Sequence, residues 1–464
     1  MPRPLTEGSI PVVLFRFALP ILFANVLQSL NGSVNSVWVG RFLGEAALTA
    51  TSNANTVMFL LIGAAFGVAL AATILVGQCI GANDVAETKR VVGTSATFFT
   101  GISVAMAMAG LVLCRPLLIA MSTPADSLDL AVAYMRVIFL ALPFLYLYAF
   151  VGAMLRGAGD SKTPFYFMLL SVGLDIALNP LFIFGLGPIP RLGIAGSALA
   201  TFVAQAVSLT ALIRHLYRRR HLLVLHRDEL ALLRVDWSVV ATLVKKGVPM
   251  SAQMLVMSLS GVLMITLVNR FGVDTTAAFG AALQLWNYIQ MPAFAVAMAM
   301  SAMTAQNVGA GMWERVREIA RVGVFYNVIL CGSIALTMEL LDTHLFALFL
   351  PAGSRALTVA SHLNHVVTPS FVFFGVAVAL FGVVRATGAV MAPLVILTIT
   401  LLVVRFPVAE LFLDRYQVDA VWWSFPISSG LSALLAVLYY KFGGWRSAHM
   451  MPANAPAATR VSPE

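Results

Sequence analysis

About twelve stretches of roughly 20 mostly apolar residues run along this chain, and such a stretch is long enough to cross a bilayer as a helix. They are centred near Ala24, Gly63, Met106, Tyr146, Leu174, Ala204, Ser258, Ala295, Leu330, Phe373, Leu397 and Leu434. Of the 464 residues, 60% are hydrophobic and only 11% are charged, whereas an ordinary soluble domain has about 25% charged residues. Because only lipid can cover so much apolar surface, we predict an all-α integral membrane protein.

The basic residues are unevenly distributed between the loops. If both termini are cytoplasmic, the loop between spans six and seven carries eight of them: Arg214, Arg218, Arg219, Arg220, Arg227, Arg234, Lys245 and Lys246. The outer loops together receive only Arg41, Arg115, Arg191, Arg270, Arg355 and Arg415. This asymmetry follows the positive-inside rule and requires an even number of spans. We therefore predict a multi-pass protein of the bacterial cytoplasmic (inner) membrane with both termini cytoplasmic, and the net charge of +9 needs no nucleic acid partner.

Two motifs occur twice at nearly the same spacing. QCIGAN at 78–83 recurs as QNVGAG at 306–311, which is 228 residues later, and LRGAGDSKTP at 155–164 recurs as VRATGAVMAP at 384–393, 229 residues later. The chain is therefore predicted to contain two pseudo-symmetric lobes of six helices in the same orientation, an organisation found in transporters. The predicted segments are an N-terminal lobe at 1–214, a basic cytoplasmic linker at 215–246, a C-terminal lobe at 247–445 and a cytoplasmic tail at 446–464.

One carboxylate, Asp175, interrupts the apolar fifth span, and Asn179 follows it at helical spacing. An acid inside a membrane helix is costly and by default marks an ion or proton pathway. Burial favours its neutral form unless a cation lies beside it. Asn35 in span one and Thr201 in span six lie on polar stripes of their own, so we predict ion coupling through Asp175, Asn35, Asn179 and Thr201. Both H⁺ and Na⁺ at Asp175 fit this pattern, and hydrogen bonding between helices is the structural alternative for the neutral residues.

A second group of residues is a candidate lining for a substrate cavity. It comprises Gln28, Gln205, Met257, Gln284, Trp286 and Tyr288. Thioether side chains adapt to ligands of many shapes, and aromatic rings stack on flat organic cations. The alternative is that these side chains belong to the helix core or face lipid.

Other polar residues are expected to have structural roles. His362 and His365 have no acid or cysteine nearby in the sequence, so we expect no metal site beyond a Na⁺ at Asp175. Arg405 lies deep in span eleven and is expected to pair with a carbonyl or a carboxylate. The three cysteines are far apart and form no metal-binding or disulfide pattern.

Several motifs, in order and in both halves, resemble those of the MATE (multidrug and toxic compound extrusion) family. They are VNSVWVGRFLGEAALTATS, VGQCIGAND, LRGAGDSKTP, LDIALNPLFIFGLG, TAQNVGAGMWERVRE and VVRFPVAELF. The likeness is closer to the DinF-like branch, although Asn35 stands where many relatives have aspartate and the order Asp175 then Asn179 is reversed. The acids that another branch carries in spans seven and ten are replaced by Met257 and approximately Phe374.

The resemblance implies a secondary active antiporter that exports amphipathic, often cationic, organic compounds in exchange for H⁺ or Na⁺ by alternating access of two lobes. The alternative is a lipid-linked saccharide flippase of the same superfamily. We expect no enzyme, because no cluster of His, Asp, Glu or Cys lies at one level and no G-x-x-x-x-G-K-[ST] motif is present. The expected partners are a small organic substrate and membrane lipid, with no cofactor besides the coupling ion, and we expect a monomer.

Overall fold

The computed structural model describes residues 5–185, 190–351 and 353–450. These residues form helices and turns without any strand, and twelve of the helical segments are long and apolar enough to cross a membrane. The predicted all-α architecture with about twelve membrane helices is therefore confirmed. The chain divides into two compact units, which contain Phe23–Gly247 and Leu5–Leu22 with Val248–Glu464 respectively.

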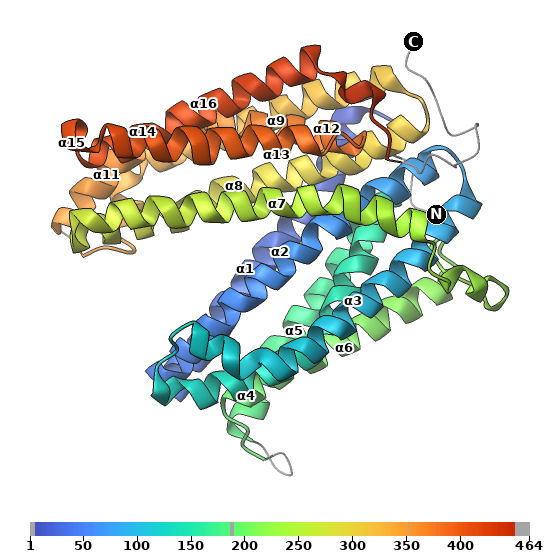
Figure 1. Cartoon of the computed structure of the whole chain (residues 1–464), viewed down its shortest axis with the longest axis horizontal. Coiled ribbons are helices and arrows are strands. Elements are labelled where there is room, and N and C mark those ends of the chain that lie inside the picture. Colours follow the sequence, from blue (N-terminus) through green and yellow to red (C-terminus); the bar gives the residue numbers. More distant parts are fainter. Residues whose placement is uncertain (1–4, 186–189, 352, 451–464) are drawn as a thin grey trace. The chain divides into compact units, whose positions relative to one another are not determined.

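The first unit is a bundle in which α2 packs on α4, and α4 also packs on α3 and α6 (Figure 1). Its core is formed by apolar side chains such as Leu118, Met135 and Leu142, which are almost fully buried. The helices of this part of the chain are α1 (Ile10–Leu43), α2 (Glu45–Gly81), α3 (Val85–Ala120), α4 (Ala125–Gly157), α5 (Lys162–Phe184) and α6 (Ile194–Arg218).

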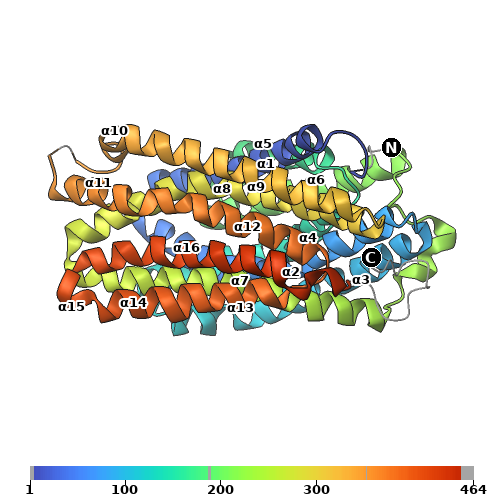
Figure 2. The same cartoon turned by 90° about the horizontal axis from the view of Figure 1, so that it is seen from above.

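The second unit is built around α8, α9, α12 and α16, which pack along one another (Figure 2). Its tenth span bends through a 3₁₀ turn at Thr368–Ser370, and its eleventh contains a π-helical segment at Ile399–Arg405. The helices are α7 (Trp237–Val268), α8 (Val273–Gly309), α9 (Trp313–Leu340), α10 (Asp342–Phe346), α11 (Arg355–Val367), α12 (Phe371–Ala386), α13 (Met391–Thr398), α14 (Phe406–Leu411), α15 (Leu413–Tyr416) and α16 (Val418–Phe442).

The backbone repeats the pseudo-symmetry found in the sequence. Asn83 after α2 and Gly311 after α8 both have left-handed φ angles, of 56° and 71°. Gly159 after α4 and Gly388 after α12 do so too, with φ angles of 86° and 105°. The two recurring motifs therefore form matched turns at the ends of matched helices, and glycine is favoured there because it adopts this conformation without a steric penalty.

The two units do not begin where the predicted lobes begin. The first turns of α1 pack in the second unit, where Leu5, Ile10, Leu14 and Phe17 join a core with residues of α8, α9 and α12. The basic segment after α6 belongs to the first unit, and α7 begins at Trp237, inside the predicted linker. The sequence alone assigned these segments by charge, but their apolar and polar contacts decide their place. Of the predicted tail, residues 451–464 lie outside the described residues.

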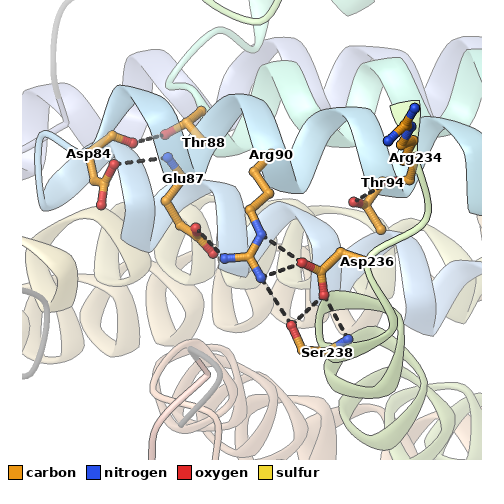
Figure 3. A network of polar contacts seen from close by, with 8 residues as sticks. All are labelled: Asp84, Glu87, Thr88, Arg90, Thr94, Arg234, Asp236 and Ser238. Atoms are coloured by element: carbon orange, nitrogen blue, oxygen red, sulfur yellow. Dashed lines mark hydrogen bonds and ion pairs between the residues drawn. The ribbon is translucent and has the colours of Figure 1, made fainter. Parts of the chain in front are cut away.

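The segment between α6 and α7 is bound to the start of α3 (Figure 3). Arg90 donates to Asp236 from Nε at 2.8 Å and from Nη2 at 2.5 Å, and Lys89 forms an ion pair with Glu229. Ser238 donates to Asp236 through its hydroxyl at 2.6 Å and its backbone amide at 2.9 Å. These Ser238 bonds and the nearby Arg90 guanidinium lower the pKa of Asp236 to about 2. The linker is therefore an ordered part of the first unit.

Candidate functional site

Asp175 lies near the middle of α5 and its side chain is only 2% exposed. It is 13 residues from the start of α5 and nine from its end, so it lies about 20 Å and about 13 Å from the two helix ends at 1.5 Å per residue. An ionised carboxylate at this depth needs hydrogen-bond donors or a cation. The surroundings of Asp175 therefore decide which form it takes.

Four side chains donate to the carboxylate. Asn31 and Asn35 on α1 donate to Oδ2 from Nδ2 at 2.9 and 2.8 Å. Thr201 on α6 donates to Oδ1 at 3.0 Å, and the Nδ2 of Asn179 lies 3.5 Å from the same oxygen. The structure thus brings together all four predicted ion-coupling residues, with Asn31 in addition. All five belong to the first unit.

The site also contains acceptor oxygens that have no donor. The Oδ1 atoms of Asn31 and Asn179 are buried and lack a hydrogen-bond partner among the described residues. A buried acceptor without a donor costs about 1–3 kcal/mol. Protonation of Asp175 would add one donor to this network, and a Na⁺ ion would accept both amide oxygens as ligands. The donor and acceptor counts therefore balance better when the site holds a proton or a cation.

Helical spacing explains how these residues meet. Asn31 and Asn35 are four residues apart on α1, as are Asp175 and Asn179 on α5, so each pair lies on one helix face. Asn179 also donates to the Oδ1 of Asn35 at 2.9 Å, which links the two helices directly. Sequence reasoning missed Asn31, although its spacing from Asn35 is the signal that could have found it.

The six candidate cavity residues do not converge on one place. Gln28, Gln284 and Tyr288 are exposed, and Gln205 and Met257 are partly buried. The Oε1 atom of Gln205 is buried without a partner, and Met257 packs against a core cluster that includes Phe381 and Leu397. In the described residues these side chains therefore form no common lining.

Trp286 and Tyr288 lie on different sides of α8. Trp286 is 1% exposed, donates from its indole nitrogen to Thr368 at 3.0 Å and packs among Phe279, Phe371 and Phe425. Tyr288 is 59% exposed. Side chains two residues apart on a helix point away from each other, so the two rings cannot sandwich a ligand together.

The histidines of the tenth span do have acidic neighbours, contrary to the expectation. His362 contacts Asp419 at 2.8 Å, and His365 contacts Glu339. Asp342 lies 3.7 Å from the other ring nitrogen of His365. Because the acids come from α9, α10 and α16, their proximity was not visible in the sequence. No group of three or more metal-ligand side chains among the described residues could hold a metal ion.

The expected partner of Arg405 was wrong. Its Nε donates to the hydroxyl of Ser428 at 2.8 Å, and its guanidinium carbon lies 4.4 Å from the centre of the Phe425 ring. Among the described residues it has neither a carboxylate within ion-pair distance nor a carbonyl hydrogen bond. The nearest acid in sequence, Glu410, pairs instead with Arg270 at 3.0 Å.

The family of the chain is shown by a comparison with known proteins. The MatE family model matches residues 20–181 and 249–411, once in each half. The chain belongs to the MatE family. This places it among transporters rather than enzymes, and the resemblance found in the sequence is confirmed. The MatE matches begin and end close to the boundaries of the two repeated halves.

Individual MatE relatives align over nearly the whole chain. A "probable multidrug resistance protein YoeA" of Bacillus subtilis (strain 168) is 35% identical over 428 residues, 92% of either chain. A second protein of that strain, "probable multidrug resistance protein YpnP", is 30% identical over 95% of this chain and 97% of its own length. A solved outward-facing multidrug resistance MATE transporter has a TM-score of 0.85 at 20% identity, covering 94% of this chain and 96% of that one. This structural likeness shows the fold.

Proposed function

We propose that this protein is a secondary active antiporter that exports amphipathic, often cationic, organic compounds in exchange for H⁺ or Na⁺. The relatives named as multidrug resistance proteins support export of drug-like compounds. The observation that carries the ion coupling is the buried Asp175 network, in which two acceptor oxygens lack a donor. Such a site gains hydrogen bonds or ion ligands when a proton or a cation enters.

The proposed cycle follows from this exchange of partners. When a proton binds Asp175, one carboxylate oxygen becomes a donor, and an amide that donated to it must rotate or move away. Asn31 and Asn35 lie on α1, so protonation or Na⁺ binding changes the contacts between α1 and α5. Coupling then requires that ion and organic compound favour opposite states of the transporter. Alternating access of the two lobes completes the exchange.

The proposed setting is the bacterial inner membrane, with both termini cytoplasmic. The excess of Lys and Arg in the loops on that side supports this orientation. Within the second unit, the two ends of the described chain lie close to the same helix ends: Leu5 bonds Gln306 at the end of α8, and Thr387 after α12 bonds Trp445. The proposed partners are the organic substrate and membrane lipid, and the proposed functional unit is a monomer.

The test uses purified protein in liposomes with proton and sodium gradients imposed separately. Efflux of a fluorescent organic cation is recorded for the wild type, for Asp175→Asn and for the control Asp129→Asn. Asp129 is a suitable control because its side chain is 82% exposed and pairs only with the exposed Arg115. We expect Asp175→Asn to lose gradient-driven efflux at least about tenfold, because an amide cannot carry a proton or a charge.

Two results would contradict the proposal. If Asp175→Asn couples to either gradient as well as the wild type does, Asp175 is not the coupling residue. If neither gradient drives efflux but a lipid-linked diphosphate sugar is translocated, the flippase alternative is correct. The gradient that drives wild-type efflux identifies the coupling ion.

A further inference from the structure

Arg405 ends a π-helical segment in the eleventh span. This segment, Ile399–Arg405, is followed after one residue by Pro407, whose nitrogen cannot donate a backbone hydrogen bond. The buried Ser260 of α7 donates to the carbonyl of Leu401 at 3.3 Å and so helps to hold the widened turn. Single π-turns inside α-helices are frequent at functional sites. The local backbone therefore positions Arg405 in a way that a regular helix would not.

The Arg405 side chain points into the second unit and toward the middle of the membrane. Val403 is 60% exposed, and a residue two positions further along a helix points to nearly the opposite side. Arg405 lies six residues, or about 9 Å, from the end of α14, whereas its partner Ser428 lies ten residues, or about 15 Å, from the start of α16 at the same end of the unit. The side chain therefore does not extend outward to the membrane surface.

The contacts of Arg405 hold the guanidinium but leave its charge unpaired. Ser428 fixes Nε, and the face of Phe425 lies against the guanidinium plane. Within the described residues, Nη1 and Nη2 have no hydrogen-bond partner and are not enclosed. A cation at membrane depth costs several kcal/mol unless it is paired or hydrated. The structure therefore contains an oriented pair of donors, the two Nη groups, that lack an acceptor.

We propose that Arg405 binds the carboxylate or phosphate group of an amphipathic organic ligand. A guanidinium presents two parallel N–H donors that match such a group, and the bond from Ser428 fixes their direction in advance. Phe425, which packs with Trp286 and Phe279, offers an apolar aromatic surface next to the charge. This ligand class widens the cationic cargo considered above to acids and zwitterions, and its transport, though not its binding, rests on the proposed export function.

Asp175 and Arg405 give each unit one charge at a comparable place in the repeat. With the offset of 229 residues set by Pro164 and Pro393, Asp175 of the fifth span corresponds to Val404, next to Arg405 in the eleventh. The acid is surrounded by four donors, whereas the guanidinium retains two free donor groups. The two units have thus diverged toward opposite chemistry, with the cationic site in the second unit.

The test measures binding of a matched pair of probes to the purified full chain in phosphatidylcholine nanodiscs. The probes are dansylaminoundecanoic acid and its uncharged methyl ester, whose dansyl fluorescence reports binding. We expect the wild type to bind the acid about tenfold or more tightly than the ester, the difference expected for charge-assisted hydrogen bonds. Arg405→Gln should abolish this preference by weakening acid binding alone, and Arg405→Lys should retain part of it.

The controls separate a local effect from unfolding. Arg415→Gln removes an exposed arginine of the neighbouring α15, which contacts only the ring of Tyr416, and should leave the preference unchanged. Ser428→Ala removes the bond to Nε and keeps the charge, so it should reduce the preference about threefold even if Arg405→Gln proves unstable. Added phosphatidylglycerol that competes with the acid in wild type but not in Arg405→Gln would identify lipid phosphate as the occupant of the same site.

The proposal is overturned if the wild type binds acid and ester equally, or if Ser428→Ala and a folded Arg405→Gln both keep the full preference. Efflux of the fluorescent organic cation provides the independent readout of the export function. If the charge preference disappears in Arg405→Gln while cation efflux persists, the anion site is correct and separable from coupling. If cation efflux is absent in the wild type but the preference is present, the export proposal fails and the anion site stands.

Discussion

The charge state of Asp175 depends on a balance between burial and its hydrogen-bond donors. Burial favours the neutral acid, whereas each N–H or O–H that points at the carboxylate favours the ionised form. Asn31 and Asn35 supply two donors to one oxygen, and Thr201 supplies the shortest contact to the other. A transporter that must bind and release a proton needs these opposing effects to be close in size.

Removing one donor should therefore shift the pH dependence of transport. In Asn31→Ala or Asn35→Ala the protonated form of Asp175 gains relative weight, so proton release into the cytoplasm becomes harder. We expect the pH of half-maximal efflux to rise and efflux at pH 7 to fall about three- to tenfold, the effect of one hydrogen bond to a charged group. Efflux rates measured over a range of internal pH check this. Asn53→Ala, which removes an amide bonded to Thr123 elsewhere in the first unit, should leave the profile unchanged.

The residues at the Asp175 site were largely predictable, because polar side chains repeat every four positions in otherwise apolar helices. Asn35, Asn179 and Thr201 were found this way. Asn31 was missed only because the stripe was drawn through Gln28, which is exposed in the structure. The role of Trp286 was not predictable, since a single sequence does not show which side of an apolar helix faces its own core.

At the scale of helices, close contacts between backbones position the first unit. Thr73 of α2 donates from Oγ1 to the carbonyl of Ala153 in α4 at 3.0 Å. One turn further along α4, a Cβ atom on Gly157 would lie 2.5 Å from the carbonyl oxygen of Thr73. Only a residue without a side chain fits there, so α2 and α4 are held at a short separation.

Gly157→Ala should consequently destabilise the protein. The added methyl group meets a backbone atom that cannot rotate away, and overpacking of this kind costs about 1–3 kcal/mol. The matched control is Gly173→Ala in α5, where nothing lies within 4 Å of the added carbon. Thermal unfolding in detergent should show a lower melting temperature for the first variant and an equal or higher one for the second. Equal melting temperatures for Gly157→Ala and the wild type would contradict the close contact.

The linker on α3 should remain attached over the whole physiological pH range. The pKa of Asp236 is about 2, below its unfolded value of about 3.9, so its stabilising contribution is complete above pH 4 and is lost as the pH falls toward 2. We expect the same slow proteolysis at Arg234 between pH 8 and pH 5, and faster cleavage in Asp236→Asn at every pH. Faster cleavage of the wild type at pH 5 than at pH 8 would contradict this assignment.

Membrane helices could be predicted because bilayer thickness sets their length, but the details within them could not. The π-turn at Ile399–Arg405 and the 3₁₀ turn at Thr368–Ser370 leave the hydropathy of their spans unchanged. The linker was predicted as a basic loop, yet its order comes from residues such as Arg90 and Lys89, which lie about 140 positions earlier. Contacts of this range are not visible in local sequence patterns.

At the scale of the whole molecule, the chain passes between the two units inside two continuous helices. The division falls between Leu22 and Phe23 in α1 and between Gly247 and Val248 in α7. Pro20 and Pro249 lie within three residues of these points and are themselves 229 residues apart. A proline inside a helix removes one backbone hydrogen bond and permits bending. We therefore expect both helices to bend near these prolines during alternating access.

Pro249→Ala should restore the backbone hydrogen bond that proline prevents and make α7 stiffer at that position. The expected outcome is a lower maximal rate of efflux, by about threefold or more, with unchanged affinity for the organic compound, since small changes at hinge positions alter conformational steps. Efflux rates at saturating substrate and equilibrium binding measure the two quantities separately. A change in affinity without a change in maximal rate would contradict a role in bending.

The placement of Leu5–Leu22 in the second unit and Trp237–Gly247 in the first has a consequence for the origin of the molecule. Each half contributes the opening turns of its first helix to the other half, an exchange like that of a domain-swapped dimer. An ancestral half-length polypeptide would have needed a second copy to complete its core. Gene fusion would then have made an obligatory dimer into one chain, and the exchanged arms ensure that neither half is complete without its sibling.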